Sequence, residues 1–107
     1  MICNICGREI EGQGNNPFPI SESDDDRCCD YCNKAYVIPA RLIMMHRVVK
    51  EPEIGDDIII FKLSGEKTAD YVLRKGTIKK IDDSGQLHGT WGGLAVIPEK
   101  DVFAIVN

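Results

Sequence analysis

Apolar residues are unevenly spread along the chain and divide it into three stretches. The first 32 residues hold few of them, between polar segments that carry Gly and Pro. From Cys29 to about Val49 apolar residues are dense and partly helical in period, which predicts a helix. Pro39 has no backbone N–H, so we expect it to end, kink or restart this helix. After Gly55 the pattern changes to short runs separated by turn residues, which is typical of β-strands.

Five short apolar runs in the C-terminal half predict five strands. Residues 82–85 are typical of a hairpin turn, and Gly92 with Gly93 of a tight two-residue turn. Strands of this length and spacing indicate a small, strongly bent antiparallel barrel of the SH3-like type, with a turn at residues 98–100 before the last strand. The runs are residues 56–63, 68–81, 86–91, 94–97 and 101–106.

The cysteines point to a metal site. All five lie within the first 32 residues, and in a reducing cytosol such a cluster is more typical of metal binding than of disulfides. Two CxxC pairs are separated by 22 residues. A two-residue gap lets both thiolates of a pair turn toward one point, and two pairs complete the tetrahedron that Zn²⁺ accepts. We therefore expect one structural zinc ion bound by Cys3, Cys6, Cys29 and Cys32.

Cys28 leaves one position of this ligand set open. With Cys28 in place of Cys29, the second pair has three intervening residues, a spacing that zinc also accepts. Spacing favours Cys29, and Cys28 is then expected to be a small buried hydrophobe. Reduced buried cysteines without a metal are the alternative, but few apolar residues surround them to offset the ordering cost of the loops. Catalytic zinc is not expected, since His46 and His88 lie far along the chain and four cysteines fill the coordination sphere.

The sequence thus predicts an α+β fold. A four-cysteine zinc-binding finger and helix are expected over residues 1–50, followed by a five-stranded SH3-like antiparallel β-barrel over residues 54–107. Whether these two parts pack as one unit stays open at this point, as does the oligomeric state.

Composition limits the class of protein. With 43% hydrophobic and 28% charged residues the chain is typical of a soluble globular domain. No run approaches the roughly 18 apolar residues of a membrane span, and the first residues lack signal-peptide features, so no membrane and a cytoplasmic setting are expected. A formal net charge of −4 argues against non-specific nucleic-acid binding as the main task.

Basic residues concentrate around the first two predicted strands. They alternate with Asp70, Asp82 and Asp83, which favours a mixed solvated surface over a phosphate-binding face. The basic residues are Lys62, Lys67, Arg74, Lys75, Lys79 and Lys80.

Two further pairs of residues are interpreted as structural. His88 and Trp91 are three apart on a predicted strand and so face opposite sides of it. A core Trp and a surface or hydrogen-bonded His are expected there, and no catalytic residue is predicted. Met44 and Met45 are expected in the core.

Residues 75–103, KGTIKKIDDSGQLHGTWGGLAVIPEKDVF, resemble a family of uncharacterised small SH3-like domains of phages and mobile elements of Gram-positive bacteria. That family shares a G-x-V-x-x-I-D-D-x-G-Q-I-H-x-x-W run, then a glycine turn and an L-A-x-I-P stretch. The N-terminal half resembles zinc-ribbon or treble-clef fingers, with CNICG as first knuckle and CCDYCN leading into a helix. The matching positions of the first resemblance are Gly76, Ile78, Ile81, Asp82, Asp83, Gly85, Gln86, Leu87, His88, Trp91, Gly92, Gly93, Leu94, Ala95, Ile97 and Pro98.

The leading hypothesis for function is a non-enzymatic, zinc-binding protein-interaction module. The resemblance implies a phage or mobile-element accessory protein, which would act on a host partner in the cytoplasm of a bacterial host cell. The alternative is a nucleic-acid-binding protein that uses the finger and the basic strands of the barrel. No small-molecule cofactor site is predicted.

Overall fold

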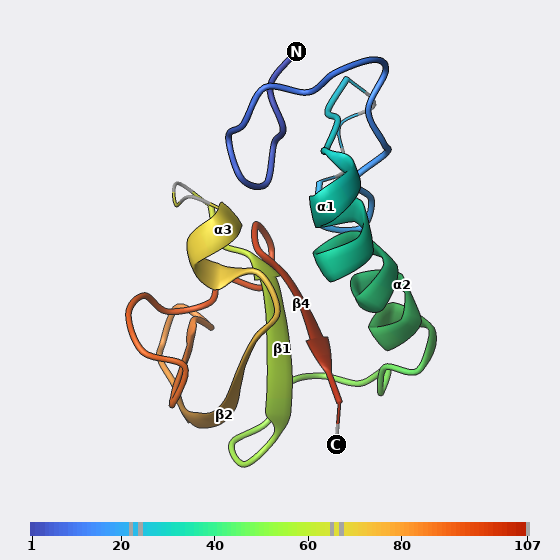
Figure 1. Cartoon of the computed structure of the whole chain (residues 1–107). Helices are drawn as coiled ribbons and strands as arrows, with labels where there is room; N and C mark the ends of the chain where they lie inside the picture. The colour runs from blue at the N-terminus through green and yellow to red at the C-terminus, as the bar shows by residue number, and fades with distance from the viewer. Residues whose placement is uncertain (22, 24, 65, 67, 107) are drawn as a thin grey trace.

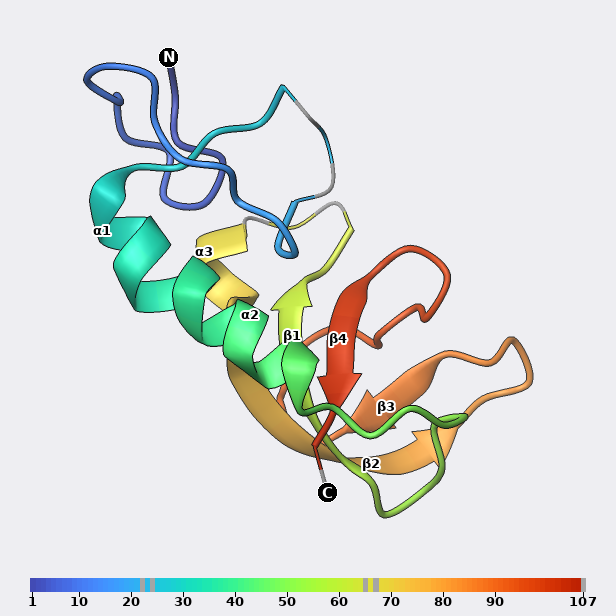
Figure 2. The same cartoon turned by 90° about the vertical axis from the view of Figure 1, so that its right-hand side faces the viewer.

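In the computed structural model, which describes residues 1–21, 23, 25–64, 66 and 68–106, finger loops lead into a helical segment and then a β-sheet (Figure 1). The helical segment lies alongside one face of the sheet, with the finger loops beyond its N-terminal end (Figure 2). The helical elements are α1 (Asp30–Cys32), the π-helical turn η1 (Asn33–Val37), α2 (Ile38–Met45) and α3 (Thr68–Tyr71), and the strands are β1 (Asp57–Lys62), β2 (Arg74–Ile81), β3 (Leu87–Gly89) and β4 (Val102–Ile105).

The helix predicted between Cys29 and Val49 forms in three consecutive pieces. Pro39 lies in the first turn of α2, where its missing N–H costs little. Just before it, the Ile38 N–H bonds to the Asn33 carbonyl five residues back, which makes η1 a π-helical turn. The helix is therefore restarted at the proline, as expected.

β1 is one of the two inner strands of the sheet and is buried on both faces. Ile58 and Ile60 belong to one hydrophobic cluster, and Ile59 and Phe61 to another. Because successive side chains of a strand point to opposite faces, the two clusters lie on opposite sides of the sheet. This explains why the sequence of β1 is a continuous apolar run and does not alternate.

The first cluster, called here the shared core, joins the finger and helix to the sheet. Residues from both predicted domains contribute to it, so one hydrophobic core crosses the predicted boundary; the domain division itself stays a prediction. Its buried members are Cys3, Ile5, Ile10, Ile20, Cys28, Cys32, Val37, Ala40, Ile59, Phe61 and Ala104. The second cluster, the sheet core, holds Ile58, Ile60, Leu63, Ile78, Leu87, Trp91, Val96 and Ile105.

The sheet has the order β3-β2-β1-β4, and every pair is antiparallel. The predicted hairpin at residues 82–85 joins β2 to β3, with the Asp82 N–H donating to the Gln86 carbonyl at 3.1 Å. Gly85 takes the positive φ of 83° that this turn requires.

The described residues form four strands in an unclosed sheet, where five strands in a barrel were expected. Run 94–97 contributes a single bridge, between Leu87 and Val96. The Leu94 carbonyl accepts a hydrogen bond from Trp91 Nε1 at 2.9 Å, which draws this segment away from a regular ladder. Run 68–81 begins with α3, and its strand starts only at Arg74.

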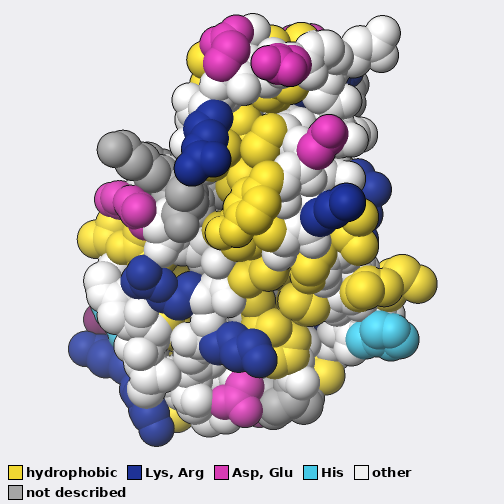
Figure 3. All heavy atoms as spheres, viewed as in Figure 1, with side chains coloured by type: hydrophobic (Ala, Val, Ile, Leu, Met, Phe, Trp, Pro, Cys, Tyr) yellow, Lys and Arg dark blue, Asp and Glu magenta, His cyan; other side chains and the backbone are white. Residues whose placement is uncertain are grey.

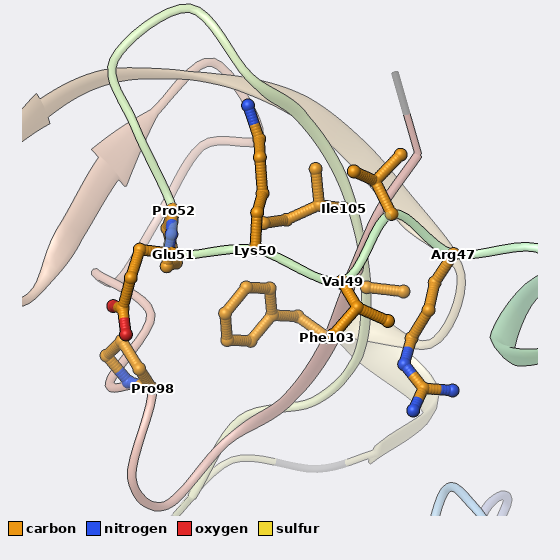
Figure 4. Close-up of a pocket in the computed structure, with 10 residues that line it drawn as sticks. Arg47, Val49, Lys50, Glu51, Pro52, Pro98, Phe103 and Ile105 are labelled. Carbon is orange, nitrogen blue, oxygen red and sulfur yellow. The ribbon is translucent and has the colours of Figure 1, made fainter.

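The linker between α2 and β1 partly covers the outer edge of β4. The Val48 N–H donates to the Ile105 carbonyl at 2.8 Å. Linker and strand line an open pocket of about 280 Å³ beside Phe103 (Figure 4). Lys50 Nζ lies 2.9 Å from the buried Asp56 carboxylate, which fixes the linker in this position.

Candidate metal centre

The first CxxC pair lies on a tight turn at the N-terminus. The Gly7 N–H donates to the Cys3 carbonyl at 3.0 Å, and Gly7 takes a positive φ of 79° that favours glycine. The N–H groups of Ile5 and Cys6 point at Cys3 Sγ, at 3.4 and 3.5 Å. Cys6 is half-buried in the same turn.

The second pair lies at the start of the helical segment. Cys29 is the N-cap of α1, and its Sγ accepts from the Cys32 N–H at 3.5 Å. Two hydrogen bonds between Asn4 and Arg27 tie the loop before this pair to the first turn. The helix start and the N-terminal turn are thereby held face to face.

The four thiols form a compact cluster. The Sγ atoms of Cys3, Cys6, Cys29 and Cys32 all lie within 4.8 Å of one another, and Cys6 Sγ is 3.8 Å from Cys29 Sγ. A regular tetrahedron with metal–sulfur bonds of about 2.3 Å has edges of about 3.8 Å. The cluster therefore has the size and donor set to hold one metal ion.

Burial and backbone donors pull the thiol pKa values apart. Burial raises the pKa of Cys6 and of Cys32. Burial would also raise the pKa of Cys3, but the backbone N–H groups of Cys6, Cys29 and Ile5 outweigh it and lower that pKa to about 6. Four close thiolates repel one another, so a bound cation is the natural partner for them.

Cys28 lies outside this cluster. It is fully buried in the shared core, and its backbone exchanges two hydrogen bonds with Asn15, at 2.9 and 2.8 Å. Burial raises the pKa of the Cys28 thiol to about 11, so it is neutral at pH 7. The geometry thus groups Cys29 with the other three cysteines and leaves Cys28 as a small core residue.

No protein-family model, curated protein or solved structure matches the chain. The resemblance of residues 75–103 to SH3-like domains of phages therefore stays a prediction. In the part of the chain that the structure describes, no helix is long and apolar enough to cross a membrane.

Only some of the basic residues that the sequence concentrates around the first two predicted strands are exposed for binding. Arg74 stacks over the Tyr71 ring, 4.6 Å from its centroid, and donates to the carbonyls of Asp70 and Trp91. The Arg74 guanidinium therefore already interacts with groups of the fold itself. Lys75, Lys79 and Lys80 on β2 are exposed, Lys62 is half-buried, and Lys67 lies outside the described residues.

His88 and Trp91 are placed as the sequence suggested. Trp91 is buried in the sheet core, whereas His88 is half-exposed with Nε2 at 2.9 Å from Asp82 Oδ2. Asp82 also accepts from the N–H groups of Ser84 and Gln86 in the turn. The hydrogen bond with His88 is the main cause of the lowered pKa of Asp82. The pair therefore fastens the β2–β3 hairpin.

One surface feature was missed from the sequence. Met44 is half-buried against the shared core as expected, but Met45 is 75% exposed and the expectation for it was wrong. Met45 follows Ile38 and Leu42 at positions i, i+4 and i+7, which places the three on one side of α2. That spacing was readable in the sequence, but it did not say which apolar side of the helix the sheet would cover.

Proposed function

We propose that this chain is a non-enzymatic, zinc-stabilised module that docks a protein partner, as an accessory protein of a phage or mobile element acting on a host protein. Zinc fits best among metals because thiolate ligands are soft and a tetrahedral site of four suits its filled d shell. A structural role follows from the donor set, since four thiolates leave no coordination position for a substrate. The phage setting rests on the resemblance of residues 75–103 alone.

The zinc ion would supply stability that the finger loops lack. Apparent zinc binding on the order of 10–16 kcal/mol in finger peptides is comparable to the whole stability of a typical domain, about 5–15 kcal/mol. Cys3 and Cys32 are members of the shared core, so the metal would also fix the helix against the sheet. The bound ion would thus stabilise the arrangement of helix and sheet to which a partner binds.

Three apolar side chains of α2 support docking most directly. Ile38, Leu42 and Met45 are 45%, 54% and 75% exposed and follow one side of the helix. Hydrophobic side chains gather in a band between the helical segment and the sheet (Figure 3). A continuous apolar surface of this kind is typical of a protein-interaction site.

Elemental analysis tests the zinc centre. Protein purified without added zinc should carry one zinc ion per chain. Cys29→Ser should lose it and unfold the finger, whereas Cys28→Ser should keep it, because Cys28 lies outside the cluster. A folded chain without metal, or loss of zinc from the Cys28 variant alone, contradicts this assignment.

Binding to a purified protein tests the docking role. Host proteins cross-linked to the zinc-loaded chain are expressed alone, and their affinity is measured with the wild type and with Cys29→Ser. We expect direct binding that requires the metal. If only DNA or RNA binds, with a steep loss of affinity as salt rises, the nucleic-acid alternative holds. The exposed lysines of β2 favour that alternative, and the net charge of −4 opposes it.

A further inference from the structure

A groove of about 440 Å³ lies between α2 and the sheet. Leu42 and Ile43 of α2 form one wall, and Ile59 of β1 with Val106 after β4 forms the other. α2 ends at Met45, and beyond it Val106 and Lys75 are exposed while Ile59 is still covered. The apolar lining therefore continues through Leu42 onto the exposed side of α2.

Both polar side chains among the described lining residues of the groove are basic ones. His46 follows the last residue of α2, and Lys75 of β2 lies directly opposite Ile59 in the sheet register. A second hollow of about 300 Å³ shares Lys75 and Val106 with the groove. It also contains Asp57, whose carboxylate accepts a hydrogen bond from Thr77 Oγ1 at 2.6 Å.

The two basic side chains of the groove indicate which kind of segment it can bind. A basic or neutral segment that covered the groove would bury the Lys75 ammonium and bring no carboxylate to it, which is costly. A second copy of this chain, related by a two-fold axis through the groove, would bring Lys75 and His46 toward their own counterparts. A segment with apolar side chains and nearby carboxylates satisfies both the apolar walls and the two basic groups.

The shape favours a helix as the occupant. Met45 lies seven positions after Ile38, a rise of about 10 Å or two helical turns. In helix-in-groove recognition an amphipathic helix lays its apolar face into a hydrophobic groove, and the walls of this groove are apolar. Strand addition at β4 is obstructed instead, because the linker already bonds to Ile105 there (Figure 4).

We propose that this groove binds an amphipathic helix of a partner protein, two to three turns long, whose apolar side chains enter the groove and whose Asp or Glu residues face Lys75 and His46. This assignment rests on the proposed docking function and adds the surface and the chemistry of the partner. The apolar contacts supply affinity, and the charges set orientation and choice of partner.

A displayed library of amphipathic helical peptides tests it. The flanking positions are varied between Asp or Glu and Lys or Arg, and selected peptides are measured by fluorescence anisotropy with the zinc-loaded chain. We expect acidic flanks to be selected. Leu42→Asp should weaken binding by at least about tenfold. Leu94→Asp, at a residue of similar exposure that does not line the groove, should leave the affinity unchanged.

A charge exchange gives the sharper readout. Lys75→Glu should weaken binding of the acidic peptides and strengthen binding of the same peptides with Lys flanks. Lys100→Glu, at a residue that lines a different pocket, should leave both affinities unchanged. Lys75 is exposed, so this variant keeps the fold, as unchanged Trp91 fluorescence and zinc content will verify.

Two results overturn the inference: selection without any preference for acidic flanks, or binding that survives both Leu42→Asp and Lys75→Glu. A purified protein partner that binds both variants as tightly as the wild type leaves the docking function standing and refutes the groove. Failure of the wild type to bind any purified protein, with acidic peptides still selected at the groove, refutes the docking function alone.

Discussion

Removing the metal should unfold the sheet as well as the finger. Cys3 and Cys32 of the cluster pack in the same core as Ile59 and Phe61 of β1. Burying an Ile or Phe side chain contributes about 1.5–3 kcal/mol each, so losing the cover over these two costs about 3–6 kcal/mol. That is a large part of the roughly 5–15 kcal/mol that typically separates folded from unfolded domains.

Trp91 reports this coupling from the opposite side of the sheet. It is the single tryptophan of the chain, is 6% exposed and belongs to the sheet core. A strong chelator is titrated in while Trp91 emission and zinc release are followed together. We expect both signals to change in one coincident transition, and excess zinc to reverse it.

Separate transitions would refute the reasoning. If the zinc leaves while Trp91 emission and the denaturant midpoint of the sheet stay unchanged, the sheet folds on its own. The contacts of Ile59 and Phe61 with the helix would then contribute little to its stability, and the predicted division into two domains would also be a division in folding.

Three further predictions concern the sheet half. Gly89→Ala should destabilise by about 3 kcal/mol in chemical denaturation, because the added Cβ would clash with the Thr77 backbone carbonyl and the Trp91 ring. Lys79→Ala, at an exposed residue of β2, should change stability by under about 0.5 kcal/mol. Asp82→Asn should lower the thermal midpoint at pH 7. The folded-state pKa of Asp82 is depressed, so its contribution is full above the ordinary Asp pKa of about 4 and is lost as pH falls through the folded value; the difference between variant and wild type should shrink in acid. Asp101→Ala should cost about 1–3 kcal/mol, since this buried carboxylate accepts from two backbone N–H groups, and equal denaturant midpoints for variant and wild type would contradict that role.

Local chemistry made several elements predictable. Cysteine spacing predicted each CxxC pair, with Cys28 left as an alternative to Cys29, and the fold brings the thiols of Cys3, Cys6, Cys29 and Cys32 within 4.8 Å. The hairpin at residues 82–85 follows from its turn residues, and the restart of the helix follows from the missing N–H of Pro39. Each of these signals acts over a few residues, so no distant contact had to be known.

The fifth strand and the exposed side of α2 were not predictable in the same way. Run 94–97 has the composition of a strand, but the Leu94 carbonyl is taken by the indole of Trp91. Met45 is as apolar as Met44, yet only Met44 faces the shared core. In both cases a tertiary contact decides between options that local propensity leaves equal.

The sequence by itself thus determined the two CxxC pairs, the class of elements and the turns, because spacing and backbone chemistry are local properties. Tertiary structure decided that β1 is covered on both faces, that one core crosses from the finger into the sheet, and that α2 ends before the sheet is fully covered. These outcomes depend on which apolar surfaces meet, and burial is non-directional. The groove beside Leu42 and Lys75 is therefore a product of packing that no single segment encodes.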